Sequence, residues 1–415
     1  MIIDLPSTTT SQLNKKMVEL RERGGAVALG RVLTLVIVAE DDEQLEDAID
    51  AANEASREHP SRVIVVAKGV RTAAPRIDGQ IRVGGDAGAS EVVVLRLYGP
   101  LASQGQSAVV PLLLPDAPIV TWWPSNGPKS PMKDPLGKLA QRRITDSAAD
   151  KNPIRSLLAR SKAYTDGDTD LAWTRLTHWR AQLAGALDLP PYEQVTGATV
   201  TGEADSPSTE LLAGWLAEYL DVPVKRNKTS SAQGIVSVTL DRPSGPVSIE
   251  RPDGRTGTLT QPGQPMRKVA LHRRDNRDCL IEELRRLDSD AVYEASLRGL
   301  AKLSGARSRS SASGSTAAKQ GTGTASSTKS SAKSSAKSTS AKSTSASKST
   351  ASKATGSKTA SKSRASSKTG GSSARGTSST RSRTSTGSTS PKTSTTPKTS
   401  KTSQASATDT GKDRA

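Results

Sequence analysis

The chain has 415 residues, no phenylalanine and one cysteine, and the single cysteine excludes an internal disulfide and any metal site built from cysteines. Its net charge of +18 is uneven, because residues 304–415 hold 21 basic and 2 acidic side chains and residues 1–303 hold 38 and 39. Residues 1–303 therefore have the charge balance of an ordinary globular protein, and charge favours nucleic acid as a partner only for the remainder.

Targeting and membrane signals are missing from the sequence. No basic segment followed by an apolar run stands near Met1, and no apolar run approaches 18 residues. We therefore expect a cytoplasmic protein that does not enter a membrane.

Residues 1–165 alternate between helical and strand patterns. A helix is expected from Thr10, and a helical repeat over 41–58 separates two continuous apolar runs at 32–39 and 62–67. That order predicts a βαβ unit and a parallel pair of strands. Further strands are expected at 81–83, 91–97 and 118–123, with a helix at 102–114 that Pro111 interrupts. We predict an α/β N-terminal domain with a mostly parallel sheet.

Residues 166–303 show a different pattern of expected helices and strands. A helix over 152–161 precedes a segment at 164–170 that is rich in Asp, Thr and Gly and is typical of a domain boundary. Helices are expected at 170–189 and 206–219, with a strand at 195–201 between them. From Gly234 the apolar period becomes two, and two helices follow at 278–287 and 290–303. We predict an α+β C-terminal domain with an antiparallel meander.

Residues 304–415 consist mainly of Ser, Thr, Ala, Lys and Gly, without an aromatic or branched aliphatic residue. Such a composition cannot bury enough apolar surface to offset chain entropy, so we expect a long disordered tail. One hypothesis is weak, salt-dependent binding of DNA or another polyanion through this tail. The alternative is a solubilising extension.

Residues 116–150 have the most distinctive composition of the chain. Trp122 and Trp123 end an apolar run that stops at Pro124, and a proline-rich loop follows. Asp134 and Pro135 then fit the cap and first position of a short helical piece. Loops at a strand end often form binding surfaces.

Two sets of residues in this stretch have alternative interpretations. If Trp122 and Trp123 lie in a strand, they point to opposite faces, so one is core and the other either anchors a partner protein or packs under the loop. An anion site for a sugar phosphate or an acidic partner would use five basic residues, Lys129, Lys133, Lys138, Arg142 and Arg143. Alternatively, Arg142 merely pairs with Asp146 across a solvated surface.

Catalytic chemistry finds little support in the sequence. His59, His178 and His272 stand singly, without the spacing of a metal site, and no glycine-rich stretch has the spacing of a phosphate-binding loop. Cys279 is expected to be an inert core residue. We predict no catalytic residue, no metal and no cofactor.

The motifs TWWP, DPLG and LAQRRITDSA in this stretch resemble those of the OpcA family, the glucose-6-phosphate dehydrogenase assembly proteins of actinobacteria and cyanobacteria. The resemblance covers residues 1 to about 303 and not the tail. It implies a non-enzymatic allosteric activator that binds glucose-6-phosphate dehydrogenase and promotes its active oligomer in the oxidative pentose phosphate pathway. The alternative is a sugar-phosphate sensor or enzyme.

We place the expected partner contact on eight residues of this signature, Trp122, Trp123, Pro124, Asp134, Pro135, Arg142, Arg143 and Asp146. In the alternative function, Arg142 and Arg143 would hold the phosphate.

Overall fold

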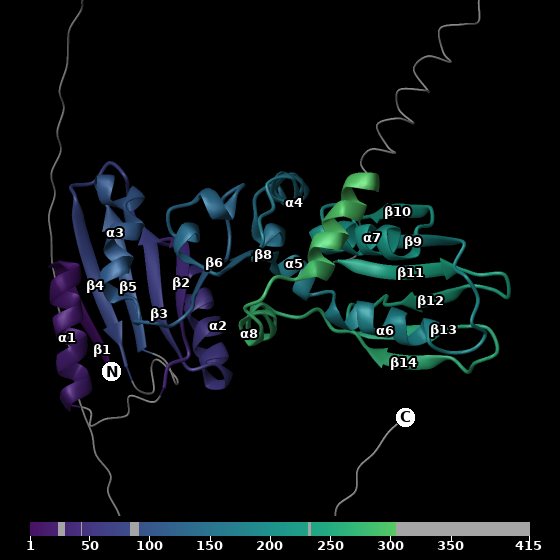
Figure 1. Ribbon diagram of the computed structural model, residues 1–415, viewed down its shortest axis with the longest axis horizontal. Coiled ribbons are helices and arrows are strands. Elements are labelled where there is room, and N and C mark those ends of the chain that lie inside the picture. Colours follow the sequence, from purple (N-terminus) through teal and green to yellow (C-terminus); the bar gives the residue numbers. More distant parts are fainter. Residues whose placement is uncertain (24–29, 43, 84–90, 231–233, 304–415) are drawn as a thin grey trace, which may run out of the picture. The chain divides into compact units, whose positions relative to one another are not determined.

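A computed structural model of the chain describes residues 1–23, 30–42, 44–83, 91–230 and 234–303 (Figure 1). The tail of residues 304–415, for which the sequence predicts disorder, lies outside the described residues. Two β-sheets organise the described part, and none of the helices in it is both long and apolar enough to cross a membrane.

The larger sheet, sheet A, has eight strands in the order β1-β4-β5-β3-β2-β6-β7-β8, which Figure 1 shows for the labelled strands. All neighbours from β5 to β8 in that order are parallel, and only β4 and β1 are antiparallel additions. The strands are β1 Ile2–Thr8, β2 Leu33–Glu40, β3 Ser61–Lys68, β4 Arg76–Arg82, β5 Glu91–Tyr98, β6 Ile119–Trp123, β7 Arg142–Thr145 and β8 Asp168–Asp170. The predicted α/β domain with a mostly parallel sheet is confirmed.

The strand order reverses at β2. The chain first adds β3 and β5 on one side of β2, with α2 (Gln44–Glu58) as the first crossover, and then returns to add β6, β7 and β8 on the other side. The carboxyl ends of β2 and β6 therefore form a topological switch point, where open α/β sheets usually bind their ligands.

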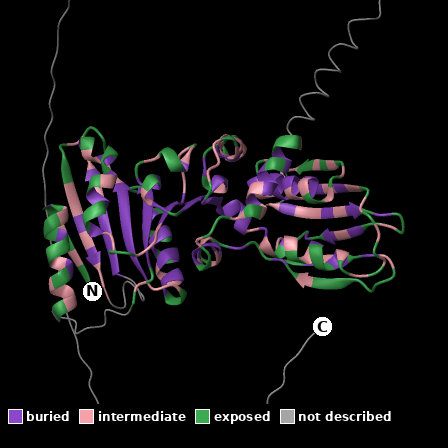
Figure 2. Ribbon diagram, viewed as in Figure 1, coloured by how far each residue is buried: buried purple, intermediate pink, exposed green. Residues whose placement is uncertain are grey.

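Sheet A has an apolar core on both faces, which explains its continuous apolar runs. Leu35 and Ile37 of β2 belong to a cluster with α2 and α8 (Asn276–Arg285), whereas Val36 and Val38 belong to a cluster with α1 (Thr10–Arg23). Figure 2 shows the central strands buried along their length. A residue in a central strand is therefore buried whichever way it points.

The second sheet, sheet B, has six strands in the order β10-β9-β11-β12-β13-β14. Its strands are β9 Gly197–Glu203, β10 Val224–Thr229, β11 Ile235–Asp241, β12 Val247–Glu250, β13 Thr256–Thr260 and β14 Arg267–Ala270. Strands β11 to β14 are antiparallel neighbours, as the period of two predicts, but β9 and β10 are parallel, so the sheet is mixed.

Helices cover one face of sheet B. They are α5 (Leu171–Thr174), α6 (Thr177–Leu187), α7 (Pro207–Leu220) and a further helix over 291–303, and their apolar residues form one core with the alternate residues of the strands. Serine 206 caps α7 by accepting a hydrogen bond from the Thr209 N–H, as its position before Pro207 predicts.

Several elements differ from the sequence prediction. The helix expected at 102–114 is a series of short turns at Gly99–Ser103, Gly105–Val109 and Val110–Leu112, and the helix expected at 170–189 is broken between α5 and α6. Strands β7, β8, β10 and β13 have no counterpart in the prediction. Strand β8 joins sheet A although it follows the expected boundary at 165, and α8 packs on α2 although the sequence assigns it to the second domain.

Candidate functional site

The two tryptophans of the signature lie inside the protein. Trp122 is 0% exposed in the cluster with α2 and α8, and Trp123 is 2% exposed in the cluster with α1, so they point to opposite faces of β6. The indole Nε1 atom of each is buried without a hydrogen-bond partner among the described residues. The expectation of an exposed tryptophan anchor is wrong, because Trp122 lies in the core with α2 and α8 and Trp123 packs under the loop that follows β6, the alternative arrangement.

The two arginines of β7 are also buried and form ion pairs within the chain. Arg142 donates from Nη2 to Glu283 Oε2 at 2.6 Å and from Nη1 to the Asp288 carbonyl at 2.6 Å. Arg143 pairs with Asp168 and donates to the Ala140 carbonyl at 2.7 Å. Burial raises the pKa of Asp168, and Arg143 opposes that shift.

These contacts correct the prediction for Arg142 and Arg143. Both guanidinium groups are directed to partners inside the fold and are 3% exposed, so an anion site open to solvent at these residues is wrong. A solvated surface pair between Arg142 and Asp146 is wrong for the same reason. The two arginines instead join β7 to α8 and to the loop before β8.

Asp146 follows β7 and is also buried. It accepts two hydrogen bonds from Arg175, at 2.9 Å from Nη1 and 2.7 Å from Nη2, and caps the next turn through the Ala148 N–H at 3.1 Å. Both roles position the chain and leave no carboxylate oxygen directed at solvent. Asp146 is 2% exposed, so its carboxylate acts inside the fold in this structure.

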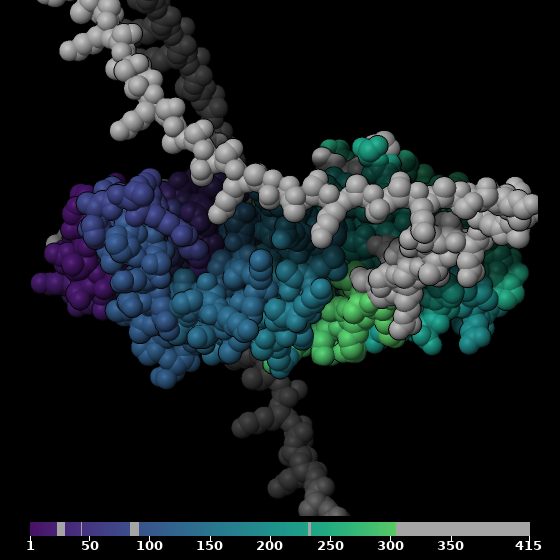
Figure 3. Space-filling model, turned by 90° about the horizontal axis from the view of Figure 1, so that it is seen from above, coloured from purple at the N-terminus to yellow at the C-terminus, as the bar shows by residue number. Residues whose placement is uncertain are grey.

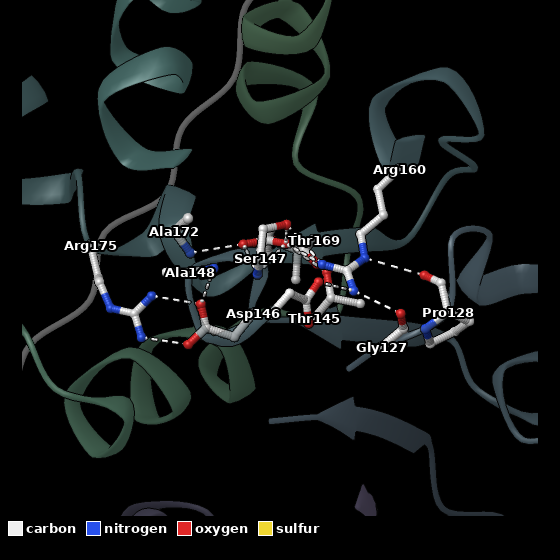
Figure 4. A network of polar contacts seen from close by, with 12 residues as sticks. Gly127, Pro128, Thr145, Asp146, Ser147, Ala148, Arg160, Thr169, Ala172 and Arg175 are labelled. Atoms are coloured by element: carbon white, nitrogen blue, oxygen red, sulfur yellow. Dashed lines mark hydrogen bonds and ion pairs between the residues drawn. The ribbon is translucent and has the colours of Figure 1, made fainter. Parts of the chain in front are cut away.

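A polar network centred on Asp170 lies beside the signature, and Figure 4 labels its members Thr145, Ser147 and Arg160. Asp170 is fully buried and accepts hydrogen bonds from the Ser147 hydroxyl at 2.6 Å, the Thr145 hydroxyl at 2.8 Å and the Ala172 N–H at 3.0 Å. Burial raises the pKa of Asp170, and the positive charge of Arg160 opposes the shift. The carboxylate thereby ties the end of β7 to the start of α5.

Arg160, on α4 (Pro153–Lys162), supplies the cation of this network. It forms ion pairs with Asp150 at 2.7 Å and Asp170 at 3.6 Å, and it donates to the carbonyls of Gly127 at 2.9 Å and Pro128 at 3.2 Å (Figure 4). One buried side chain thus fixes the loop after β6 to the edge of sheet A.

The solvent-exposed part of the signature is the loop of residues 125–139, here called the lysine loop. Its exposed residues are Asn126, Lys129, Met132, Lys133, Pro135 and Lys138, whereas Pro124, just before it, is buried. Figure 3 shows the blue segment around residue 130 at the surface of the face seen there. The cationic residues that reach solvent are therefore the three lysines and not the two arginines.

Two local contacts shape the backbone of the lysine loop. Asp134 accepts from the Leu136 N–H at 2.9 Å, although the short helix begins at Gly137 with Leu136, and not Asp134, as its cap residue. A Cβ atom on Gly137 would stand 1.9 Å from the Pro131 carbonyl oxygen, so only glycine fits this close approach. These contacts hold the turn that carries Lys133 and Lys138.

The switch point of sheet A does not fit a dinucleotide. In sheets of this topology a glycine-rich turn after the first parallel strand cradles phosphate at a helix N-terminus. Here β2 ends at Glu40 and is followed by Asp41 and Asp42, and Asp41 pairs with Arg96 at 3.0 Å. Carboxylates at this position oppose the binding of a phosphate group.

Few other groups in the described residues offer catalytic or metal chemistry. His178 and His272 lie with ring centroids 6.1 Å apart, an approach that their sequence spacing does not reveal. Burial raises the pKa of Cys279 to about 12, which keeps it a thiol. No group of three or more His, Cys, Asp or Glu side chains suited to a metal ion occurs in the part of the chain that the structure describes.

Asp150, Arg160, Asp170 and Arg175 were not predicted from the sequence. Arg160 lies ten residues from both Asp150 and Asp170, and Arg175 lies 29 residues from Asp146, so no local spacing marks them. The one signal available is that the signature ends at Asp146 and Asp150, carboxylates that require cations if they are buried.

Solved structures that resemble this chain include several oxidoreductases. An oxidoreductase from Sinorhizobium meliloti has a TM-score of 0.39 and 9% identity over 66% of this chain and 95% of its own. Glucose-6-phosphate 1-dehydrogenase from Mycobacterium avium has a TM-score of 0.35 and 10% identity over 65% of this chain and 90% of its own. A search of curated proteins finds no match.

Two family models match the sequence. One is described as the glucose-6-phosphate dehydrogenase subunit N-terminal domain and matches residues 52–162. The other is described as the C-terminal domain of the same subunit and matches residues 166–297. Together they cover more than half of the chain, including the whole signature stretch. The chain therefore belongs to the OpcA family of glucose-6-phosphate dehydrogenase assembly proteins.

Proposed function

We propose that this chain is a non-catalytic assembly factor that binds glucose-6-phosphate dehydrogenase and promotes its active oligomer. The observation that carries the proposal is that both described halves match domains of a subunit associated with that enzyme. The site geometry supports it, because the signature residues are used to build a rigid support and the switch point carries acidic side chains.

The physical mechanism is a shift of population. A factor that contacts only the assembled dehydrogenase lowers the free energy of that form and not of the separate subunits. If it binds the assembled form about 100-fold more tightly, saturation raises the ratio of assembled to unassembled enzyme by about 100-fold. Activation of the first step of the oxidative pentose phosphate pathway then follows without any reaction on this chain.

We place the contact surface on the lysine loop. Its three lysines suit an acidic patch on the dehydrogenase, and Met132, which is 37% exposed, adds an apolar contact between them. Pro135 remains part of the proposed contact, whereas the tryptophans, Arg142, Arg143 and Asp146 support the loop from inside.

Reversing the three charges of the loop tests this placement. The variant Lys129→Glu/Lys133→Glu/Lys138→Glu is expected to bind the dehydrogenase at least about tenfold more weakly, because like charges then face each other across the interface. The affinity is measured by calorimetry at physiological ionic strength, together with the activation of the dehydrogenase.

The matched control is Lys225→Glu/Lys228→Glu/Lys268→Glu, which makes the same charge change at exposed positions on β10 and β14. It is expected to bind as the wild type does. Equal affinities of the two triple variants would show that the contact lies elsewhere on the chain.

The basic tail supports a second proposal, binding of DNA or another polyanion through residues 304–415. Its 21 basic and 2 acidic side chains are the observation in favour. The full chain is expected to retain duplex DNA with an affinity that falls on the order of 10³-fold between 50 and 200 mM salt if it contacts about six phosphates.

A chain that ends at Leu303 should lose this DNA binding and keep its activation of the dehydrogenase, since residues 1–303 are nearly neutral. Electrophoretic mobility shifts at several salt concentrations measure the first effect. A truncated chain that retards DNA as well as the full chain does would assign the binding to the folded part.

A further inference from the structure

A cavity of about 230 Å³ lies at the N-terminus of α7. The residues of its wall that carry the argument are Arg175, Trp179, Glu203, Asp205, Arg251 and Arg273. The first turn of α7 also borders it, with Ser206 and Ser208. None of these residues belongs to the lysine loop, so the cavity is separate from the proposed partner contact.

Arg251 is a buried cation in the cavity wall. It is 4% exposed and donates to the carbonyls of Leu271 at 2.7 Å and Ile235 at 2.6 Å, but its Nε atom has no acceptor and no carboxylate pairs with it among the described residues. Burial lowers the pKa of Arg251, and the nearby positive charge of Arg273 lowers it further. The charge of Asp253 and the ring of Trp179 offset the cost of burying this cation in part, and an anion that reaches Arg251 would offset more of it.

Two further groups add positive potential at the same place. Arg273 is exposed, lines the cavity and pairs with no carboxylate among the described residues. Helix α7 is 14 residues long, and its N-terminus carries the partial positive charge that favours phosphate, although Pro207 has no N–H and the Thr209 N–H is bonded to Ser206. Arg175 adds little net charge, because Asp146 neutralises it.

The cavity wall also offers hydrogen-bond acceptors. Glu203 accepts from the Gly234 N–H at 2.9 Å and retains acceptor capacity, and Asp205, directly before Ser206, is exposed. These carboxylates oppose a bare anion but accept hydrogen bonds from hydroxyl groups. The ring of Trp179 lies 5.2 Å from the Arg251 guanidinium, so it makes a cation–π contact with that group and also adds apolar surface to the wall.

We propose that this cavity binds a small phosphorylated sugar or polyol, with its phosphate at Arg251, Arg273 and the first turn of α7 and its hydroxyl groups at Glu203 and Asp205. The combination of cationic groups and hydrogen-bond acceptors in one cavity wall fits such a molecule better than it fits free phosphate. The site is independent of the proposed function, because it needs no dehydrogenase. It replaces Arg142 and Arg143 as the place where a sugar phosphate binds.

Calorimetry on the full-length chain at 150 mM salt tests the proposal with glucose 6-phosphate as the probe. The wild type is expected to bind one equivalent saturably. Arg273→Gln is expected to weaken binding at least about tenfold, as loss of a charge-assisted contact does. The control is Arg267→Gln, which removes an exposed arginine of β14 outside the cavity and leaves the tail and net charge matched.

Equal affinity in the Arg273→Gln and Arg267→Gln variants, or no saturable heat with the wild type, would overturn the site. Inorganic phosphate tests the proposed hydroxyl contacts at Glu203 and Asp205. It is expected to bind at least about tenfold more weakly than glucose 6-phosphate, and Glu203→Gln is expected to reduce this difference in affinity. If phosphate binds as tightly as the sugar phosphate, the assignment of the sugar hydroxyl groups to Glu203 and Asp205 is wrong. Binding of the dehydrogenase is measured separately, so failure of one proposal leaves the other standing.

Discussion

Replacing Arg160 by methionine is expected to lower the free energy of unfolding of the chain by about 3–5 kcal/mol, the usual result of removing one partner from a buried ion pair. The variant leaves Asp150 and Asp170 buried without their cation and removes the donor to the Gly127 and Pro128 carbonyls. Methionine keeps most of the side-chain volume, so the decrease in the free energy of unfolding measures the contribution of the charge and the hydrogen bonds. Urea denaturation followed by tryptophan fluorescence measures it.

Arg155→Met is the matched control, because Arg155 lies on the same helix but is exposed. Its expected effect is within about 0.5 kcal/mol. An Arg160→Met variant as stable as this control would show that the network contributes nothing to stability.

The pH dependence of the stability loss in the Arg160→Met variant identifies its origin. Burial already raises the pKa of Asp170 in the wild type, and removing Arg160 removes the group that opposes this shift. A folded-state pKa above the unfolded one means that the folded protein retains a proton that the unfolded chain releases. The loss in the Arg160→Met variant should therefore shrink as the pH falls into the range where Asp170 protonates. A loss that is the same at every pH would assign the effect to packing.

The sequence predicts the central strands of sheet A well and its edge poorly. Strands β2 and β3 are continuous apolar runs, and such runs have one simple explanation, burial on both faces. Strand β7 begins with two adjacent arginines, and a reading based on hydropathy assigns charged residues to the surface. Its buried state depends on Glu283 and Asp168, which lie 141 and 25 residues away and cannot be matched to it by local spacing.

The same limit applies to the candidate site. The composition of residues 116–150 marks this stretch as unusual, and the structure does concentrate its polar contacts there (Figure 4). What composition cannot distinguish is a paired arginine inside the fold from an arginine open to a partner. The exposed lysines and the buried arginines differ only in their position in the topology. Strand β6 is buried because β2 and β7 pair with its edges and other parts of the chain pack on both of its faces.

Trp123→Ala is expected to lower the free energy of unfolding by about 3–5 kcal/mol, the range for removing a buried aromatic side chain. The ring lies in the cluster with α1 and packs beside Gly137, under the lysine loop. Trp123→Phe is expected to cost less, about 1–2 kcal/mol, because it keeps an aromatic ring and the indole Nε1 has no hydrogen bond to lose. The half-buried Trp215 of α7 provides the control: Trp215→Ala should cost less than Trp123→Ala.

The Trp123→Ala and Trp123→Phe variants also distinguish a ring that supports the lysine loop from a ring that contacts the dehydrogenase directly. Trp123→Ala removes the ring on which the lysine loop packs. We therefore expect this variant to bind the dehydrogenase more weakly, even though the ring itself contacts no partner. Trp123→Phe keeps a ring under the lysine loop and changes no surface group. Its affinity for the dehydrogenase should therefore lie within about twofold of the wild-type affinity, a difference of about 0.4 kcal/mol. A folded Trp123→Phe variant that binds tenfold more weakly would place the indole in the interface, and β6 would then have to open for the partner to reach it.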